Sequence, residues 1–191
     1  MPNLKQKTYN AVHFIVFDLE ATCWEGSPPG KVSEIIEIGA FKVNPYGEVE
    51  DRFSRFVKPV LNPFLSSFCQ ELTSIRQEEV DRARPFPQVI ESFQDWADIW
   101  EEDYVLCSWG NYDRRMLVQD CQLHRLEHDW AEKHINLKFQ YHQFKRLKKM
   151  RGMKHAIEAE GFDFDGTHHR GIDDAANLVK LFVKYIDEWQ Y

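Results

Sequence analysis

The chain has 191 residues, with 24 Lys and Arg against 31 Asp and Glu, so its formal net charge is −7. Hydrophobic residues make up 43% of it and include 14 Phe, 7 Tyr and 6 Trp, a composition that excludes intrinsic disorder and favours one compact domain over 1–191. An acidic chain is a poor non-specific binder of polyanions, so any nucleic-acid role requires a local basic patch or metal ions.

Membrane and secretory classes are also disfavoured. No apolar run reaches the roughly 18–20 residues of a membrane-spanning helix. The segment 1–10 is polar and lacks the apolar stretch of a secretory signal, and we expect it to form a flexible tail. The four cysteines show no C-x-x-C spacing, which disfavours a zinc knuckle or a disulfide framework and is typical of a reducing cytoplasm.

The first third of the chain predicts three strands. Val12–Asp18 is a continuous apolar run, typical of a buried central strand. A Pro- and Gly-containing loop follows at 27–30. Ile35–Val43 and Val49–Val57 are predicted to be strands joined by a hairpin turn at 44–47.

The rest of the chain alternates between helices and strands. In chain order we expect short helical pieces within 66–83, the second capped by Thr73 or Ser74, then a helix over 87–100, a strand over 104–109, a helix over 111–123, a short strand over 135–137, and helices over 139–150, 153–160 and 173–189. A meander followed by crossovers predicts an α/β domain. Its mixed five-stranded sheet has three antiparallel strands, then parallel strands, and helices flank it.

Two carboxylates mark the end of the first strand. Asp18 and Glu20 face the same side of an extended chain, about 6–7 Å apart. Such a pair suits a hard divalent cation such as Mg²⁺. A solvated acidic pair at a strand end is the alternative for this motif taken alone.

Two further motifs carry acidic or titratable groups. Asp113 follows Trp109-Gly110, where a strand passes into a helix, and the carboxyl ends of strands are where α/β sheets place their sites. His169 and Asp174 precede and open the last helix, and a histidine is the natural proton acceptor for a water nucleophile. Favourable helix-dipole and capping contacts would explain each acid separately.

In this order the motifs resemble those of the DEDDh exonucleases, the DnaQ-like 3′-to-5′ group with an RNase H-like fold. The resemblance runs from about Val12 to Ile186, and finer features resemble the Eri-like branch, which includes KapD-type proteins. Those features are Asp18-Leu19-Glu20-Ala21-Thr22-Cys23, Glu71-Leu72-Thr73-Ser74-Ile75, Pro85-Phe86 and His168-His169-Arg170-Gly171-Ile172-Asp173-Asp174. The branch more usually has Gly at position 74 and Arg at position 167, and neither departure touches an expected metal ligand.

The resemblance implies a two-metal site with a histidine base. Two Mg²⁺ or Mn²⁺ ions would be held by Asp18, Glu20, Asp113 and Asp174, and His169 would accept a proton from the attacking water. The residues implied to contact the terminal nucleotide are Leu19, Ala21, Thr22, Leu72, Thr73 and Asn111. The implied reaction is hydrolysis from a 3′ end that releases nucleoside 5′-monophosphates.

The substrate is left open at this stage. We expect single-stranded RNA or RNA 3′ overhangs, with DNA or short oligonucleotides as one alternative and a KapD-like regulatory protein that acts by binding as another. The segment 145–154 holds six cations and no acid, which favours a phosphate-binding strip over a solvated helix face. We expect a cytoplasmic monomer or homodimer.

Overall fold

A computed structural model describes residues 12–26 and 28–191. The predicted tail at 1–10 and residue 27 of the predicted loop lie outside this part of the chain. None of the helices in the described part is long and apolar enough to cross a membrane.

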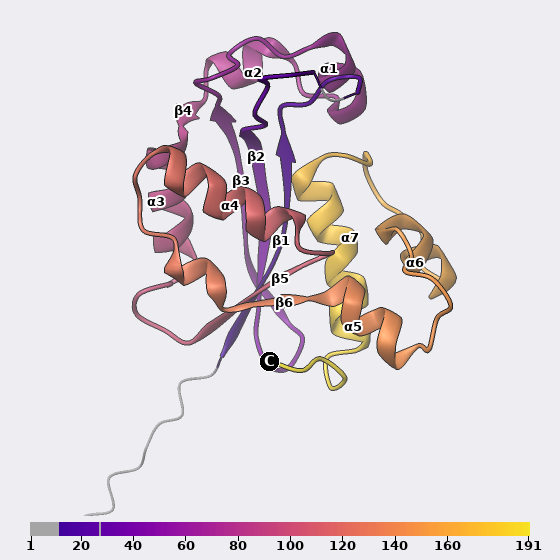
Figure 1. Cartoon of the computed structure of the whole chain (residues 1–191). Helices are drawn as coiled ribbons and strands as arrows, with labels where there is room; N and C mark the ends of the chain where they lie inside the picture. Colours follow the sequence, from indigo (N-terminus) through magenta and orange to yellow (C-terminus); the bar gives the residue numbers. More distant parts are fainter. Residues whose placement is uncertain (1–11, 27) are drawn as a thin grey trace, which may run out of the picture.

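The described chain forms a six-stranded mixed sheet in the order β4-β3-β2-β1-β5-β6 (Figure 1). Its strands are β1 (His13–Ala21), β2 (Ile35–Val43), β3 (Val49–Lys58), β4 (Arg84–Pro85), β5 (Tyr104–Ser108) and β6 (His134–Asn136). The first three strands are antiparallel, and β5 and β6 run parallel to β1. The predicted α/β class and all five predicted strands are therefore confirmed.

The sixth strand, β4, is an addition to the predicted sheet. It pairs in parallel with the end of β3, where Val57 lies opposite Arg84. Two residues are too few to show a period-2 pattern, and Pro85 argues against a strand in the sequence. Proline is nevertheless tolerated here because β4 is an edge strand.

Seven α-helices are present in the described residues, together with a 3₁₀ turn at Asp129–Glu132. They are α1 (Ser67–Thr73), α2 (Gln77–Asp81), α3 (Phe86–Trp96), α4 (Tyr112–Leu123), α5 (Leu137–Phe144), α6 (Met153–Ala159) and α7 (Gly171–Lys184). Four predicted details are wrong. Helix α7 ends at Lys184 instead of residue 189. Helix α2 is capped by Arg76, not by Thr73 or Ser74, and α3 ends at Trp96 instead of residue 100. Helix α5 ends at Phe144 because Arg146 takes a left-handed conformation with φ 50°.

Helices cover both faces of the sheet (Figure 1). Odd-numbered residues of β1, such as Ile15 and Phe17, pack in one apolar cluster with α3 and α4. Even-numbered residues, such as Phe14 and Val16, pack in a second cluster with α5, α6 and α7. This alternation follows from the pleat of the strand, and it directs the next even-numbered residues toward the start of α7.

The start of α7 lies almost on the sheet. A Cβ atom at Gly39 would come within 2.2 Å of the backbone carbon of Gly171, and one at Gly171 would lie 3.1 Å from the Asp18 carbonyl oxygen. Glycine on both elements therefore permits a backbone approach that any side chain would block. This approach brings the last sequence motif to the end of β1.

Candidate active site

Three carboxylates from the two ends of the chain meet at the end of β1. Asp18 and Glu20 continue the even-numbered face of β1 that looks toward α7, and Asp174 lies in the first turn of α7. Each of the three offers a ligand oxygen, and these oxygens all lie within 4.8 Å of one another. The structure thus brings together two motifs that are more than 150 residues apart in the sequence.

Asp113 joins this cluster from the neighbouring parallel strand. Strand β5 pairs with β1, and the chain turns through Gly110 into α4, whose first turn carries Asp113. The side chain is buried, and its Oδ1 accepts a hydrogen bond from the backbone N–H of Leu19 at 3.3 Å. Asp113 is therefore fixed directly beside the Asp18–Glu20 segment.

Two histidines border the cluster from the loop before α7. Nδ1 of His168 lies 3.0 Å from Oδ1 of Asp174, while the backbone N–H of His169 donates to the other oxygen at 3.2 Å. The two imidazole rings stack with centroids 4.0 Å apart. Among the described residues, no hydrogen-bond partner engages the ring nitrogens of His169, so this imidazole is available to a substrate or to water.

Burial and mutual repulsion raise the pKa values of the carboxyl groups. Burial, followed by the charges of Asp174 and Glu37, raises the pKa of Glu20 to about 9. Burial raises the pKa of Asp113 to about 6, although hydrogen bonds to its carboxylate oppose this. The pKa values of Asp18 and Asp174 are also raised, in each case first by burial.

No Lys or Arg in the described residues forms an ion pair with these four carboxylates, and only His168 contacts one of them as a potential cation. Three buried acids and the partly buried Asp18, without a compensating cation, are a costly arrangement, which their raised pKa values reflect. Oxygen-only donor sets of this kind suit hard divalent cations. The donor set therefore fits a metal site.

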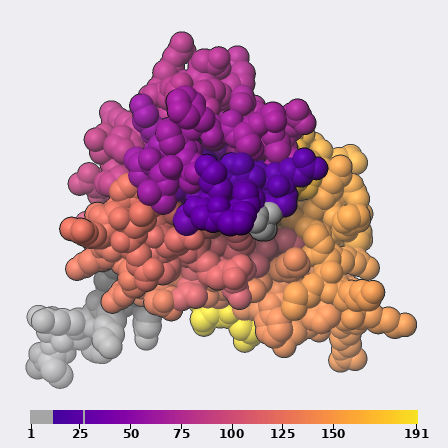
Figure 2. Space-filling model, turned by 45° about the horizontal axis from the view of Figure 1, so that its top comes forward, coloured from indigo at the N-terminus to yellow at the C-terminus, as the bar shows by residue number. Residues whose placement is uncertain are grey.

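A cavity of about 260 Å³ opens over the cluster. It is lined by Asp18, Leu19, Glu20, Trp109, Tyr112, Asp113, Met153, His168, His169 and Asp174. Figure 2 looks toward this end of the molecule, with the segment after β1 in indigo near the centre and the α5–α6 region in orange at the right. Trp109 also packs against Tyr141, with ring centroids 5.5 Å apart, so it serves both the core and the cavity wall.

The residues predicted to contact a terminal nucleotide are in different environments. Leu19 lines the cavity, but Asp113 already accepts its backbone N–H. Thr22 is buried, its backbone N–H donates to the Glu34 carbonyl, and its hydroxyl accepts from the Glu34 N–H. Ala21 is buried as well. The backbone donors of Leu19 and Thr22 are thus used within the protein.

The three remaining predicted contacts lie outside the lining of this cavity. Leu72 is partly exposed on α1, whereas Thr73 is fully buried and its hydroxyl donates to the Cys69 carbonyl. Asn111 is exposed at the N-cap of α4. Contact of these residues with a nucleotide stays a prediction.

Sequence reasoning missed several residues of this site. His168, Tyr112 and Met153 line the cavity, and Glu37 lies close enough to raise the pKa of Glu20. A signal existed for Glu37, because it is a single carboxylate within the apolar run Ile35–Val43. The packing of Met153 into the site was not readable from the sequence.

Known proteins that resemble this chain are exonucleases, which agrees with the geometry of the site. A family model described as an exonuclease of the RNase T type matches residues 15–182. The chain belongs to the DEDDh exonuclease family. It is 36% identical to the solved nuclease domain of 3′hExo, a DEDDh family member bound to rAMP, with a TM-score of 0.87 over 95% of this chain and 94% of that one.

Two curated relatives of this DEDDh chain are an exoribonuclease and KapD. It is 37% identical to human 3′-5′ exoribonuclease 1 over 92% of its own length and 53% of the relative's. It is 30% identical to the probable 3′-5′ exonuclease KapD of Bacillus subtilis over 93% of its own length and 86% of the relative's. The chain thus spans about half the length of the exoribonuclease 1 proteins it matches. Exonucleases of the DEDDh family depend on divalent metal ions.

Proposed function

We propose that this protein is a metal-dependent 3′-to-5′ exonuclease that hydrolyses phosphodiester bonds of single-stranded RNA or RNA 3′ overhangs and releases nucleoside 5′-monophosphates. The convergence of Asp18, Glu20, Asp113 and Asp174 beside a histidine carries this proposal. A protein that only binds nucleic acid gains nothing from four clustered acids, which repel phosphate unless cations intervene.

The four carboxylates would hold two Mg²⁺ or Mn²⁺ ions. Divalent cations at such a site supply Lewis-acid stabilisation of the phosphodiester and lower the pKa of water. The protein itself contributes by holding the metal-ligating carboxylates in place. Asp113 is held by the Leu19 N–H, and Asp174 is held by His168 and by the His169 N–H.

His169 is assigned the role of proton acceptor. Burial and the neighbouring His168 lower its pKa, so the imidazole is neutral at pH 7 and has an acceptor nitrogen. His168 is less suited to this role because its Nδ1 is engaged by Asp174. A positioned base of this kind contributes about 10²–10⁴-fold to the rate.

The cavity suits the end of a single strand. It is small, and the aromatic rings of Trp109 and Tyr112 border it. Stacking of a base on an aromatic side chain contributes about 1–3 kcal/mol and does not require a particular sequence. The proposal of RNA over DNA is supported by the exoribonuclease relatives and by the rAMP-bound structure.

The basic segment 145–154 would contact the phosphates upstream of the terminal nucleotide. Residues 145–152 form the loop between α5 and α6, so the predicted helix over 139–150 extends too far, and Lys154 lies in α6. Lys145 pairs with Glu160 at 2.9 Å, whereas Lys148 and Lys149 are exposed and form no ion pair with any described residue. The Arg151 carbonyl accepts a hydrogen bond from Trp109, which ties the loop to the cavity wall.

A time course on 5′-labelled single-stranded RNA and DNA with Mg²⁺ or Mn²⁺ tests the proposal. We expect products that shorten by one nucleotide at a time from the 3′ end, and no products with EDTA or with Asp18→Asn. A faster reaction on DNA would replace the RNA assignment by a DNA-directed one. Absence of cleavage of polymers and dinucleotides with both metals would overturn the enzyme assignment in favour of a regulatory binding protein.

A further inference from the structure

Glu37 is a buried carboxylate that the proposed chemistry leaves without a role. It lies on β2 directly opposite Glu20 in the antiparallel register, and only 1% of its surface is exposed. Both side chains therefore lie on the face of the sheet that looks toward α7. A fifth acid beside four others is unfavourable unless it has partners of its own.

The partners of Glu37 all come from the start of α7. Oε1 accepts from Nη2 of Arg170 and Oε2 accepts from its Nε, both at 3.2 Å. Oε2 also accepts the backbone N–H of Gly171 at 2.9 Å. Because both oxygens are engaged in this way, Glu37 is held apart from the metal-binding set. Glu37 also caps the N-terminus of α7 from strand β2, because the N-cap residue Arg170 makes no capping hydrogen bond through its own side chain.

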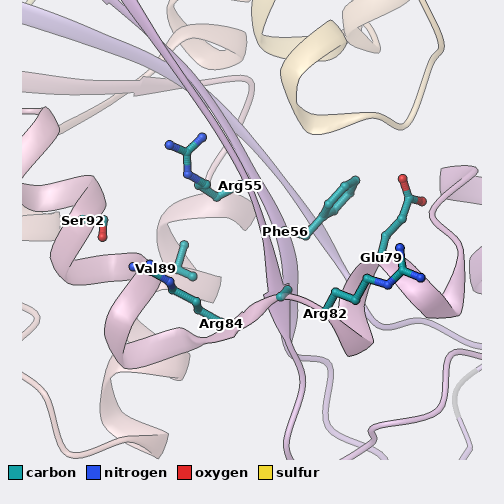
Figure 3. A pocket seen from close by; sticks show the side chains of 8 residues that line it. Arg55, Phe56, Glu79, Arg82, Arg84, Val89 and Ser92 are labelled. Carbon is teal, nitrogen blue, oxygen red and sulfur yellow. The ribbon is translucent and has the colours of Figure 1, made fainter.

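The guanidinium of Arg170 is fixed on its other side by an aromatic ring. It lies 5.3 Å from the ring centroid of Phe56 on β3. Figure 3 shows Phe56 projecting from β3 on the side opposite Arg55 and toward the side of Glu79. Phe56 is the residue opposite Glu37 in the β2–β3 register, so Glu20, Glu37 and Phe56 form one row across three strands.

Arg170, which binds Glu37, lies in the sequence between His169 and Asp174, the two groups of the site that require accurate placement. His169 directly precedes Arg170 and has a left-handed backbone with φ 63°, which is unfavourable for a non-glycine residue. On its other side the backbone of His169 is bound by Asp174. The last residues before α7 are thus held by Asp174 through the His169 N–H and by Glu37 through Arg170.

We propose that Glu37 and Arg170 are positioning residues of the exonuclease, a proposal that rests on the function proposed above. The bidentate pair and the Gly171 N–H bond fix the start of α7 on the sheet. They hold the His169 backbone in its left-handed conformation and Asp174 within reach of Asp18 and Glu20. Neither residue lines the cavity over the carboxylates, so both would act through His169 and Asp174.

The test compares Glu37→Gln, Arg170→Ala and Arg170→Lys with wild type, and uses Glu34→Gln as the matched control. Glu34 is equally buried, and its carboxylate also accepts backbone N–H groups, but from residues 60–62 rather than from α7. Three quantities are measured for each variant: kcat and KM on single-stranded RNA, the dissociation constant for Mg²⁺ by calorimetry, and Tm.

We expect Glu37→Gln and Arg170→Ala to lower kcat by about tenfold or more and to leave KM within about twofold. The Mg²⁺ affinity of Arg170→Ala should fall because Asp174 is displaced. The affinity of Glu37→Gln should fall less, because losing the Glu37 charge also lowers the pKa of Glu20. Arg170→Lys should be intermediate, since it keeps the charge and loses the bidentate geometry. The double variant should be no worse than the poorer single variant. Glu34→Gln should lower Tm and keep kcat.

The proposal is overturned if folded Glu37→Gln and Arg170→Ala keep wild-type kcat and Mg²⁺ affinity, or if Glu34→Gln loses kcat to the same degree as they do. If Glu37→Gln does not fold, the two Arg170 variants carry the test, because that side chain is 24% exposed. A wild-type protein that cleaves nothing would refute the proposed function. The Mg²⁺ affinities of the variants would still decide whether the pair positions Asp174.

Discussion

Metal binding to this protein should release protons, because the carboxyl that must become a ligand is protonated at neutral pH. Burial and the charges of Asp174 and Glu37 raise the pKa of Glu20 to about 9. At pH 7 only about 1% of Glu20 is then ionised, whereas Asp113, with a pKa of about 6, is about 90% ionised. Binding a cation at pH 7 should therefore release about one proton from Glu20 and a further fraction from Asp18, whose pKa is also raised.

The magnitude follows from the two pH units between neutrality and the Glu20 pKa. Deprotonating Glu20 at pH 7 costs about 2.7 kcal/mol, so Mg²⁺ should bind about 50-fold more weakly at pH 7 than at pH 9, where about half of Glu20 is ionised. The raised pKa of Glu20 also sets the direction in which folding stability changes with pH. Glu20 binds more protons in the folded metal-free protein than in the unfolded chain between about pH 4.5 and 9, so the contribution of Glu20 to stability should fall as pH rises through this range.

Calorimetric titration with Mg²⁺ in buffers of different ionisation enthalpy measures the protons released. Repeating it from pH 6.5 to 8.5 should show Kd falling by about tenfold per pH unit. In Glu20→Gln the release should decrease by about one proton, and the pH dependence should flatten. A wild-type binding enthalpy that is independent of the buffer, together with a flat pH dependence, would refute the reasoning.

Three further changes have defined outcomes. His169→Asn should lower kcat by about 10²–10⁴-fold and leave the Mg²⁺ Kd unchanged, because the imidazole acts on the proton and is not needed as a ligand. Gly39→Ala places a Cβ within 2.2 Å of the Gly171 backbone and should destabilise the fold by about 3 kcal/mol or more in urea denaturation. Replacing Lys148 and Lys149 by Gln should raise KM on long RNA and reduce the salt slope of binding by about 1.4.

Matched variants separate these effects from general damage. Gly152→Ala is the control for Gly39, because a Cβ there meets only His155 Nδ1 at 3.7 Å, and it should keep wild-type stability. Lys133→Gln is the control for the basic loop, since it lies just before β6, at the end of the parallel strands away from the cavity. Equal salt slopes for this control and the loop variant would contradict phosphate binding by the loop.

Local patterns in the sequence were sufficient for the order of the elements and for the acidic motifs. The apolar run before Asp18 predicts a buried strand, and the alternation after residue 86 predicts the crossovers, because both depend on neighbours within one element. Helix ends were predicted less well. Helix α5 stops at Phe144 because Arg146 adopts a left-handed backbone, and a run of helix-favouring residues does not reveal this.

The sequence alone placed Asp18, Glu20, Asp113 and Asp174 at element ends through strand and helix periodicity, and the family resemblance predicted their role as metal ligands. Only the tertiary structure decided which atoms meet. The register of β1 and β2 places Glu37 beside Glu20, and the glycine contact between β2 and α7 brings Arg170 onto Glu37. The contact of Arg170 with Glu37 depends on backbone approach between residues 133 apart in the sequence, which no local pattern encodes.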